Sequence, residues 1–192
     1  IGLSSGDHDR DNVEQIQSMM EKKYSEHYTD AWQHALGQLH IVPFTSFHQG
    51  IHVLNILLSK QSPLPRLLDL VYDNTHYIHH GQVTVDQHFK KLNHFGRNTG
   101  DALQWEQTEK ILTALRDYLV ELSQSQHQDK ACFEQAKAMI SGKVTPLKTL
   151  IQKSQKTQPQ IRVWLDAIAQ QSWGLVVQGA HREMQSAWRR QV

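Results

Sequence analysis

The feature that most restricts the fold is a long stretch of helical periodicity in residues 159–192. Pro159 suits a first helical turn, where its missing N–H would have no partner in any case. A continuous helix of this length would measure roughly 50 Å, and we expect the shorter helices to bury their apolar faces against it. Two helices hinged near Gly174 or Gly179 are the alternative. Large apolar residues recur every three or four positions, as on one helix face: Ile161, Trp164, Leu165, Ile168, Leu175, Val176, Met184 and Trp188.

Length and charge limit what the rest of the chain can be. The chain has 192 residues, a net charge of +1 and one cysteine, Cys132. A chain of this size can bury a sizeable core and needs no disulfide. The mixture of both charges argues against a nucleic-acid groove or a polybasic membrane face. No apolar run reaches the roughly 18 residues of a membrane span, and no signal peptide is evident. Because the sequence starts at Ile1 rather than methionine, we expect a piece of something larger.

Seven shorter helices are expected before the long one. The first begins where Asp11 and Glu14 form a capping box, and residues 1–10 form a flexible lead-in. Asp129 is expected to cap the sixth helix, and Thr145 with Pro146 to open the seventh. The expected ranges are 11–39, 46–59, 63–74, 84–92, 103–123, 129–142 and 145–152. No strand pattern is present, so the fold class is all-α: an elongated multi-helix bundle with a long C-terminal helix, divisible near 93–102.

Thirteen histidines raise the possibility of a metal site. His48 and His52 are four residues apart and would share a helix face, but no third ligand lies near them. A further group falls between residues 76 and 94: His76, His79, His80, His88 and His94. Because zinc sites use a complete ligand set at fixed spacing, we expect these histidines to face solvent. The sequence predicts no metal and no cofactor.

Catalytic patterns are also missing from the sequence. No G-x-S-x-G elbow occurs, and Cys132 lies in an apolar helical pattern that is typical of a buried residue. The stretch GRNTGD at 96–101 lacks the lysine of a phosphate loop. We interpret Asp7 and Asp9 as solvent-exposed charges rather than as an acid/base pair. We therefore expect no enzyme activity and no catalytic residues.

Five tryptophans are more informative, because aromatic residues bury large areas. They serve mainly as core residues, and the candidate core is Trp32, Leu36, Leu64, Leu68, Phe89, Trp164, Leu165, Ile168, Trp173 and Leu175. Tryptophan is also over-represented at interfaces. Trp188, followed by Arg189 and Arg190, is the candidate junction with a neighbouring domain or subunit.

Four blocks in order carry a family resemblance: YTDAWQHALGQLHIVPF, SPLPRLLDLVYDNT, VDQHFKKL and the segment 161–192. Together they resemble the IcmF/TssM inner-membrane subunit of the bacterial type VI secretion system, over residues 24–192. The matching positions are Tyr28, Trp32, Leu36, Leu39 and Pro43; Ser62, Pro63, Leu64, Leu67, Leu68, Val71 and Thr75; Val85, Phe89 and Leu92; and Trp164, Leu165, Ile168, Ser172, Trp173, Leu175, Trp188 and Val192.

The resemblance implies a periplasmic location and a structural role. Such proteins have N-terminal membrane spans, a nucleotide-binding-like cytoplasmic domain and a large periplasmic region. That region is mostly helical and ends in a β-rich domain that binds an outer-membrane lipoprotein. Residues 11–192 look like the helical periplasmic part, which contacts a second inner-membrane subunit and further copies of itself. The resemblance supplies no catalytic residues here. A periplasmic ligand- or peptide-binding helical module, lined by the histidines at 76–94, is the alternative.

Overall fold

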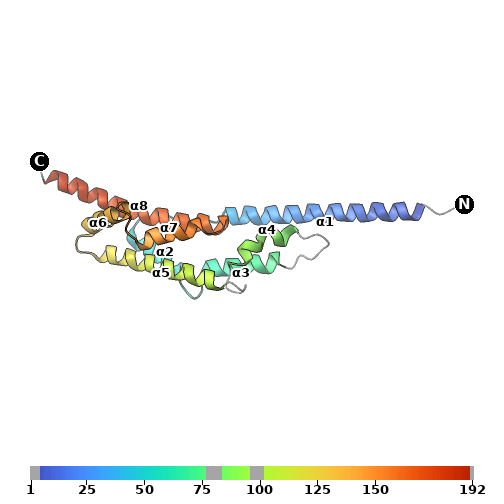
Figure 1. Ribbon diagram of the computed structural model, residues 1–192, viewed down its shortest axis with the longest axis horizontal. Coiled ribbons are helices and arrows are strands. Elements are labelled where there is room, and N and C mark those ends of the chain that lie inside the picture. The colour runs from blue at the N-terminus through green and yellow to red at the C-terminus, as the bar shows by residue number, and fades with distance from the viewer. Residues whose placement is uncertain (1–4, 77–83, 96–101, 191–192) are drawn as a thin grey trace.

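The computed structural model describes residues 5–76, 84–95 and 102–190 (Figure 1). These residues form helices and no strand, which confirms the all-α class. In this part of the chain, no helix combines the length and the apolar character that crossing a membrane would require. The helices are α1 (Ser5–Gly37), α2 (Phe47–Leu57), α3 (Pro63–Thr75), α4 (Thr84–Asn93), α5 (Ala102–Gln124), α6 (Gln128–Ile140), α7 (Pro146–Gln155) and α8 (Pro159–Arg189).

The long C-terminal helix is present as α8, with 31 residues. It runs unbroken through Gly174 and Gly179, so the continuous helix is confirmed and the hinged alternative is wrong. No atom outside the helix backbone lies within 4 Å of a Cβ placed at Gly174, so this glycine is not required by packing. Residues 191 and 192 lie outside the described part.

The expectation that every shorter helix packs on α8 is wrong. α8 packs mainly against α6 and α7, whereas α5 packs against α2 and α7. α3 and α4 pack against each other, and α4 packs against α1. Figure 1 shows the reason: α3 and α4 lie beyond the N-terminal end of α8, beside α1. Two long helices, α1 and α8, therefore set the long axis of the molecule.

α1 differs most from the sequence-based expectation. It begins at Ser5 rather than Asp11, so the second half of the expected lead-in is helical and the proposed capping box lies inside the helix. The N-terminal half of α1 projects from the body, and residues 12–20 are all exposed. From residue 12 onward, where the α1 side chains are described, Ser25, Thr29 and Leu36 are the buried ones.

Local signals explain where several helices start and stop. Thr145 caps α7 as expected, because its side chain accepts a hydrogen bond from the Lys148 N–H at 3.2 Å. Gly142 follows α6 with a φ of 84°, a backbone conformation that favours glycine. Ser62 precedes α3 but makes no capping bond. The third residue of α3 is Pro65, which has no N–H to offer a cap.

The predicted cap of α6 is wrong. α6 begins at Gln128, with His127 in the N-cap position, and Asp129 lies within the first turn. The Asp129 carboxylate instead accepts three bonds from the Arg182 guanidinium on α8, of 3.0, 3.2 and 2.8 Å. A carboxylate in a first turn interacts favourably with the helix dipole, so this position suits Asp129 without a capping role.

Candidate interaction surfaces

The ten candidate core residues belong to one apolar cluster or pack against it. Trp32 and Trp173 are partly buried and pack against this core. The other eight are buried: Leu36, Leu64, Leu68, Phe89, Trp164, Leu165, Ile168 and Leu175. Trp105, one of the five tryptophans expected mainly in the core but absent from the candidate core list, is 1% exposed and meets Phe95 edge-on at 6.4 Å between ring centroids. Its spacing of seven residues from the buried Leu112 is the signal that could have found it.

We call the extended arrangement of α1 and α8 the rod, and three contacts that hold its elements together the joints. The first joint links α8 to the segment that follows α1. The indole Nε1 of Trp164 donates a hydrogen bond to the backbone carbonyl of Leu39 at 3.0 Å. About two helical turns further along α8, the side chain of Gln171 accepts a bond from the Phe44 N–H at 2.8 Å. Both ends of the 39–44 segment are therefore fixed to α8, and this segment determines the direction in which α1 leaves the body.

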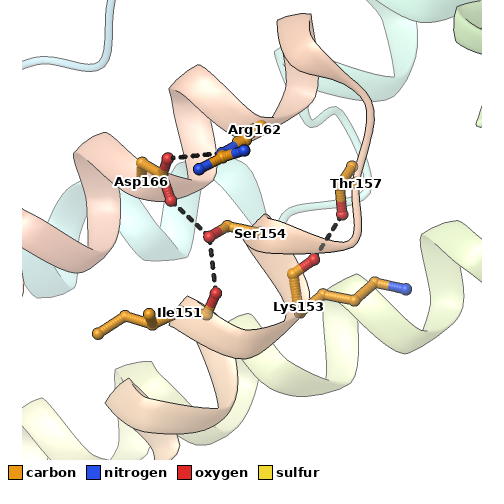
Figure 2. Close-up of polar contacts among 6 residues, drawn as sticks. All are labelled: Ile151, Lys153, Ser154, Thr157, Arg162 and Asp166. Carbon is orange, nitrogen blue, oxygen red and sulfur yellow. Dashed lines mark hydrogen bonds and ion pairs between the residues drawn. The ribbon is translucent and has the colours of Figure 1, made fainter.

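A second joint fixes the corner between α7 and α8 (Figure 2). The Ser154 side chain is fully buried and its hydroxyl lies within hydrogen-bond distance of the Ile151 carbonyl, at 2.8 Å, and of the Asp166 carboxylate. Asp166 also pairs with Arg162 at 3.3 Å. Thr157 donates to the carbonyl of Lys153 at 2.8 Å, which closes the turn. The polar run at 153–158 is thus an ordered corner rather than a loose linker.

The third joint is a close approach of α6 and α8. A Cβ placed at Gly179 would lie 2.6 Å from the sulfur of Cys132, so α8 needs glycine here to come this near. Cys132 is fully buried, and burial raises the pKa of its thiol to about 11. The thiol is therefore protonated near neutral pH and suits packing rather than nucleophilic chemistry.

The histidines do not converge where the structure describes them. His48 and His52 are exposed on α2, and His88 and His94 are exposed at α4. The His76 ring stacks on Tyr72 at 4.5 Å and its Nδ1 lies 3.7 Å from Asp86. His79 and His80 lie outside the described residues. Within 5–76, 84–95 and 102–190, no group of three or more His, Cys, Asp or Glu residues could hold a metal ion.

An apolar groove lies beside the first joint. It has a volume of about 250 Å³. It is lined by the 39–42 segment, α2 and the start of α3, together with Trp164 of α8. Ile56 at its rim is 46% exposed, although it is a large apolar residue. The lining residues are Leu39, His40, Ile41, Val42, Val53, Ile56, Leu57, Pro63, Leu64, Leu67 and Trp164.

The predicted junction at the end of α8 lies on the surface. Trp188 is 70% exposed, and Arg189 and Arg190 are exposed beside it. Two further apolar residues, Val177 and Met184, are exposed at 41% and 50% and lie eleven and four positions before Trp188. These three residues share a helix face, and we call them the α8 stripe.

A second exposed stripe lies on the projecting half of α1, and sequence reasoning missed it as a surface. Val13, Ile16, Met20 and Tyr24 are exposed at 62%, 53%, 68% and 64%. Their spacing places them on one face of the helix. Periodicity identified this face but could not show that nothing in the described chain covers it. We call these four residues the α1 stripe.

A comparison with known protein families finds a similarity for the N-terminal part of the chain. Residues 2–76 match the family model described as IcmF-related, intracellular multiplication and human macrophage-killing. This N-terminal part of the chain is similar to IcmF-related proteins. Searches of curated proteins and of solved structures found no match.

The matched segment covers α1, α2 and α3. It includes the first two resemblance blocks, from Tyr28 to Thr75, whereas the third and fourth blocks lie outside it. It also includes the α1 stripe, the 39–42 segment and most of the apolar groove. The similarity to IcmF-related proteins therefore concerns this end of the molecule.

Proposed function

We propose that this chain is a periplasmic helical strut in the membrane complex of a type VI secretion system. In this proposal it is part of an inner-membrane protein, and it supports assembly of the envelope-spanning complex. Its partners are other subunits of that complex: a second inner-membrane subunit, and an outer-membrane lipoprotein that is bound mainly through a following domain. The similarity to IcmF-related proteins supports the secretion role, and the extended arrangement of α1 and α8 supports the mechanical one.

The observation that carries this proposal is the bond between Trp164 and Leu39, at 3.0 Å. A strut must not bend where its long elements meet, and this bond lies where α1 ends and α8 begins. Trp164 is 4% exposed, so water does not compete strongly for the indole N–H. The corner at Ser154 and the close approach at Gly179 then hold α7 and α6 along α8 and stiffen it.

A flexible insertion tests the strut directly. A Gly/Ser insert after Gln38, in the intact protein within its bacterium, separates α1 from the fixed 39–44 segment. We expect loss of secretion and loss of subunit co-purification at normal protein levels. The same insert after Gln126, in the exposed α5–α6 connection, is the matched control and should preserve both. Full secretion with the Gln38 insert would contradict the strut.

The alternative, a ligand- or peptide-binding module, is supported by the apolar groove. From the sequence, this alternative depended on the histidines at 76–94. The groove is apolar, so it favours an apolar peptide segment instead. An amphipathic helix placed in such a groove buries its apolar face. Binding of an amphipathic peptide measured by calorimetry, abolished by Ile56→Glu and preserved by Ile140→Glu, would favour this function. Ile140 is exposed at 81% and does not line the groove.

A further inference from the structure

The apolar groove continues along one face of α3 beyond the residues that line it. Pro63 and Leu67 line the groove, and Leu70 follows them at the spacing that keeps residues on the same side of a helix. Leu70 is 52% exposed, and Leu39 and Val42 on the opposite wall are exposed at 41% and 56%. Large apolar side chains that are exposed together are typical of interaction surfaces. We call the groove together with Leu70 the extended groove; its α3 face is about 10 Å long, or roughly two helical turns.

The non-helical wall of the extended groove is held in place by α8. The backbone around the 39–42 segment is bonded to Trp164 at Leu39 and to Gln171 at Phe44. Trp164 also lines the groove, so one side chain forms part of the surface and fixes its wall. A partner therefore meets a surface that is already formed, and little free energy is lost in ordering it on binding.

Charge indicates the kind of partner that the extended groove fits. No aspartate or glutamate occurs between Asp30 and Asp69, a stretch that includes the 39–42 wall, α2 and the start of α3. Two exposed cations lie in this stretch: Lys60 in the turn between α2 and α3, and Arg66 on α3. Neither of them forms an ion pair in the described part of the chain. The surface around the α2–α3 turn therefore carries positive charge that is not compensated nearby.

The carboxylates closest in sequence to the lining residues do not cancel this charge. On α8, Asp166 is bonded to Ser154 of α7 at the corner between the two helices. On α3, Asp69 and Asp73 lie on either side of Leu70 in the sequence, at the end of the extended groove away from the α2–α3 turn. The positive charge is thus concentrated at the α2–α3 end.

We propose that the extended groove holds an amphipathic helix of another protein, with carboxylates beside the apolar face of that helix at the α2–α3 end. Apolar side chains spaced by three, four and seven residues on the partner enter the groove. Its carboxylates then meet Lys60 and Arg66, so that the charges of the two surfaces complement each other. The inference rests on the peptide-binding function proposed for the groove, and it adds the length and the charge of the partner.

Two peptides that differ only in charge test the proposal. Each has about 18 residues, or five helical turns, with leucines along one face; one carries glutamates beside that face and the other carries lysines. Their binding to the chain is measured by fluorescence anisotropy. We expect the glutamate peptide to bind about tenfold more tightly at low salt, because attractive charge pairs replace repulsive ones. High salt should remove most of this difference, because it screens exposed charges.

Charge reversal beside the groove should reverse this preference. The Lys60→Glu/Arg66→Glu variant should bind the lysine peptide more tightly than the glutamate peptide, and both positions are exposed, so folding is preserved. The matched control is Lys143→Glu/Arg189→Glu, which makes the same change of charge at exposed positions that do not line the groove. This control should keep the preference of the wild-type chain for the glutamate peptide.

The length of the contact is tested at Leu70. Leu70→Ser should weaken the binding of both peptides, because it removes apolar surface at the far end of the extended groove. Ile140→Ser is the matched control, since Ile140 is exposed at 81% and does not line the groove. Unchanged binding by Leu70→Ser would overturn the extension along α3.

The contrary outcomes separate this inference from the binding function on which it rests. Equal affinity for the two peptides, with both lost in Ile56→Glu, would keep the groove as a binding site and overturn its preference for an acidic partner. Failure of both peptides to bind would overturn the binding function and the inference together. A preference for the glutamate peptide that persists in Ile56→Glu would mean that the peptide binds elsewhere, and it would overturn the inference.

Discussion

Trp164 and Leu39 are 125 residues apart in the sequence and are joined by one hydrogen bond of 3.0 Å from the indole N–H to the backbone carbonyl. The bond is half-buried at the meeting point of the two long helices, beside the apolar groove. Trp164 therefore has two roles that can be separated by substitution, namely apolar packing in the core and fixing of the chain that follows α1.

Substitution of Trp164 should separate these two roles. Trp164→Ala removes both and should destabilise the fold by about 3–5 kcal/mol, as expected for loss of a buried tryptophan. Trp164→Phe keeps a buried ring and loses the hydrogen bond, with a smaller cost of about 1–3 kcal/mol because the Leu39 carbonyl loses its partner. Thermal or urea unfolding measures both. Val163→Ala is the matched control, because Val163 is exposed at 59% on the same helix. Equal unfolding of Trp164→Ala and wild type would show that this joint does not stabilise the fold.

The same substitution, glycine to alanine, should change the stability of the fold in opposite directions at two positions of α8. Gly179→Ala places a Cβ 2.6 Å from the Cys132 sulfur and 2.7 Å from its Cβ, so α6 and α8 must move apart. Overpacking of this kind typically costs about 1–3 kcal/mol. The Cβ added by Gly174→Ala has no atom within 4 Å of it, so this substitution should stabilise the helix by about 0.5–1 kcal/mol. Urea midpoints of the two variants decide this prediction, and a neutral Gly179→Ala would contradict the close approach.

The buried thiol of Cys132 should make stability fall in alkaline solution. Burial raises its pKa from 9.0 to about 11, so the unfolded chain loses this proton at a lower pH than the folded chain. The stability from the protonated thiol is fully present below about pH 9 and is lost as the pH rises towards about 11. Tyr118, whose pKa burial raises to about 12, adds to the loss at still higher pH.

Urea unfolding over this pH range measures the effect. The Cys132→Ala variant removes the thiol and should lose less stability than wild type between about pH 9 and pH 11. The slopes are compared rather than the absolute values, because the smaller side chain also leaves a cavity. Parallel curves for the two proteins would show that the thiol is not held protonated by the fold.

How far the sequence predicts this structure depends on the distance over which each signal acts. Thr145 and Gly142 act on their own helix ends, and both act as predicted. The continuity of α8 through Gly179 also follows from its apolar spacing. Asp129 was misread as a cap because its partner Arg182 is 53 residues away and cannot be identified from local pattern.

The α1 stripe shows the same limit for packing. The spacing of Val13 and Met20 shows that one face of the helix is apolar, but not whether another helix covers that face. In the structure, α4 covers the later part of α1 and the first half projects from the body. The interaction surfaces of the rod therefore emerged only when the helices were placed in space.

Solution X-ray scattering of the monomer, separated by size exclusion, tests the central claim that α1 and α8 form one extended rod. α1 has 33 residues and α8 has 31. Placed end to end at 1.5 Å per residue, they predict a maximum dimension of about 95 Å and a radius of gyration well above the roughly 16 Å of a compact chain of this length. A radius of gyration near 16 Å would mean that α1 folds back on the body, and it would contradict the rod.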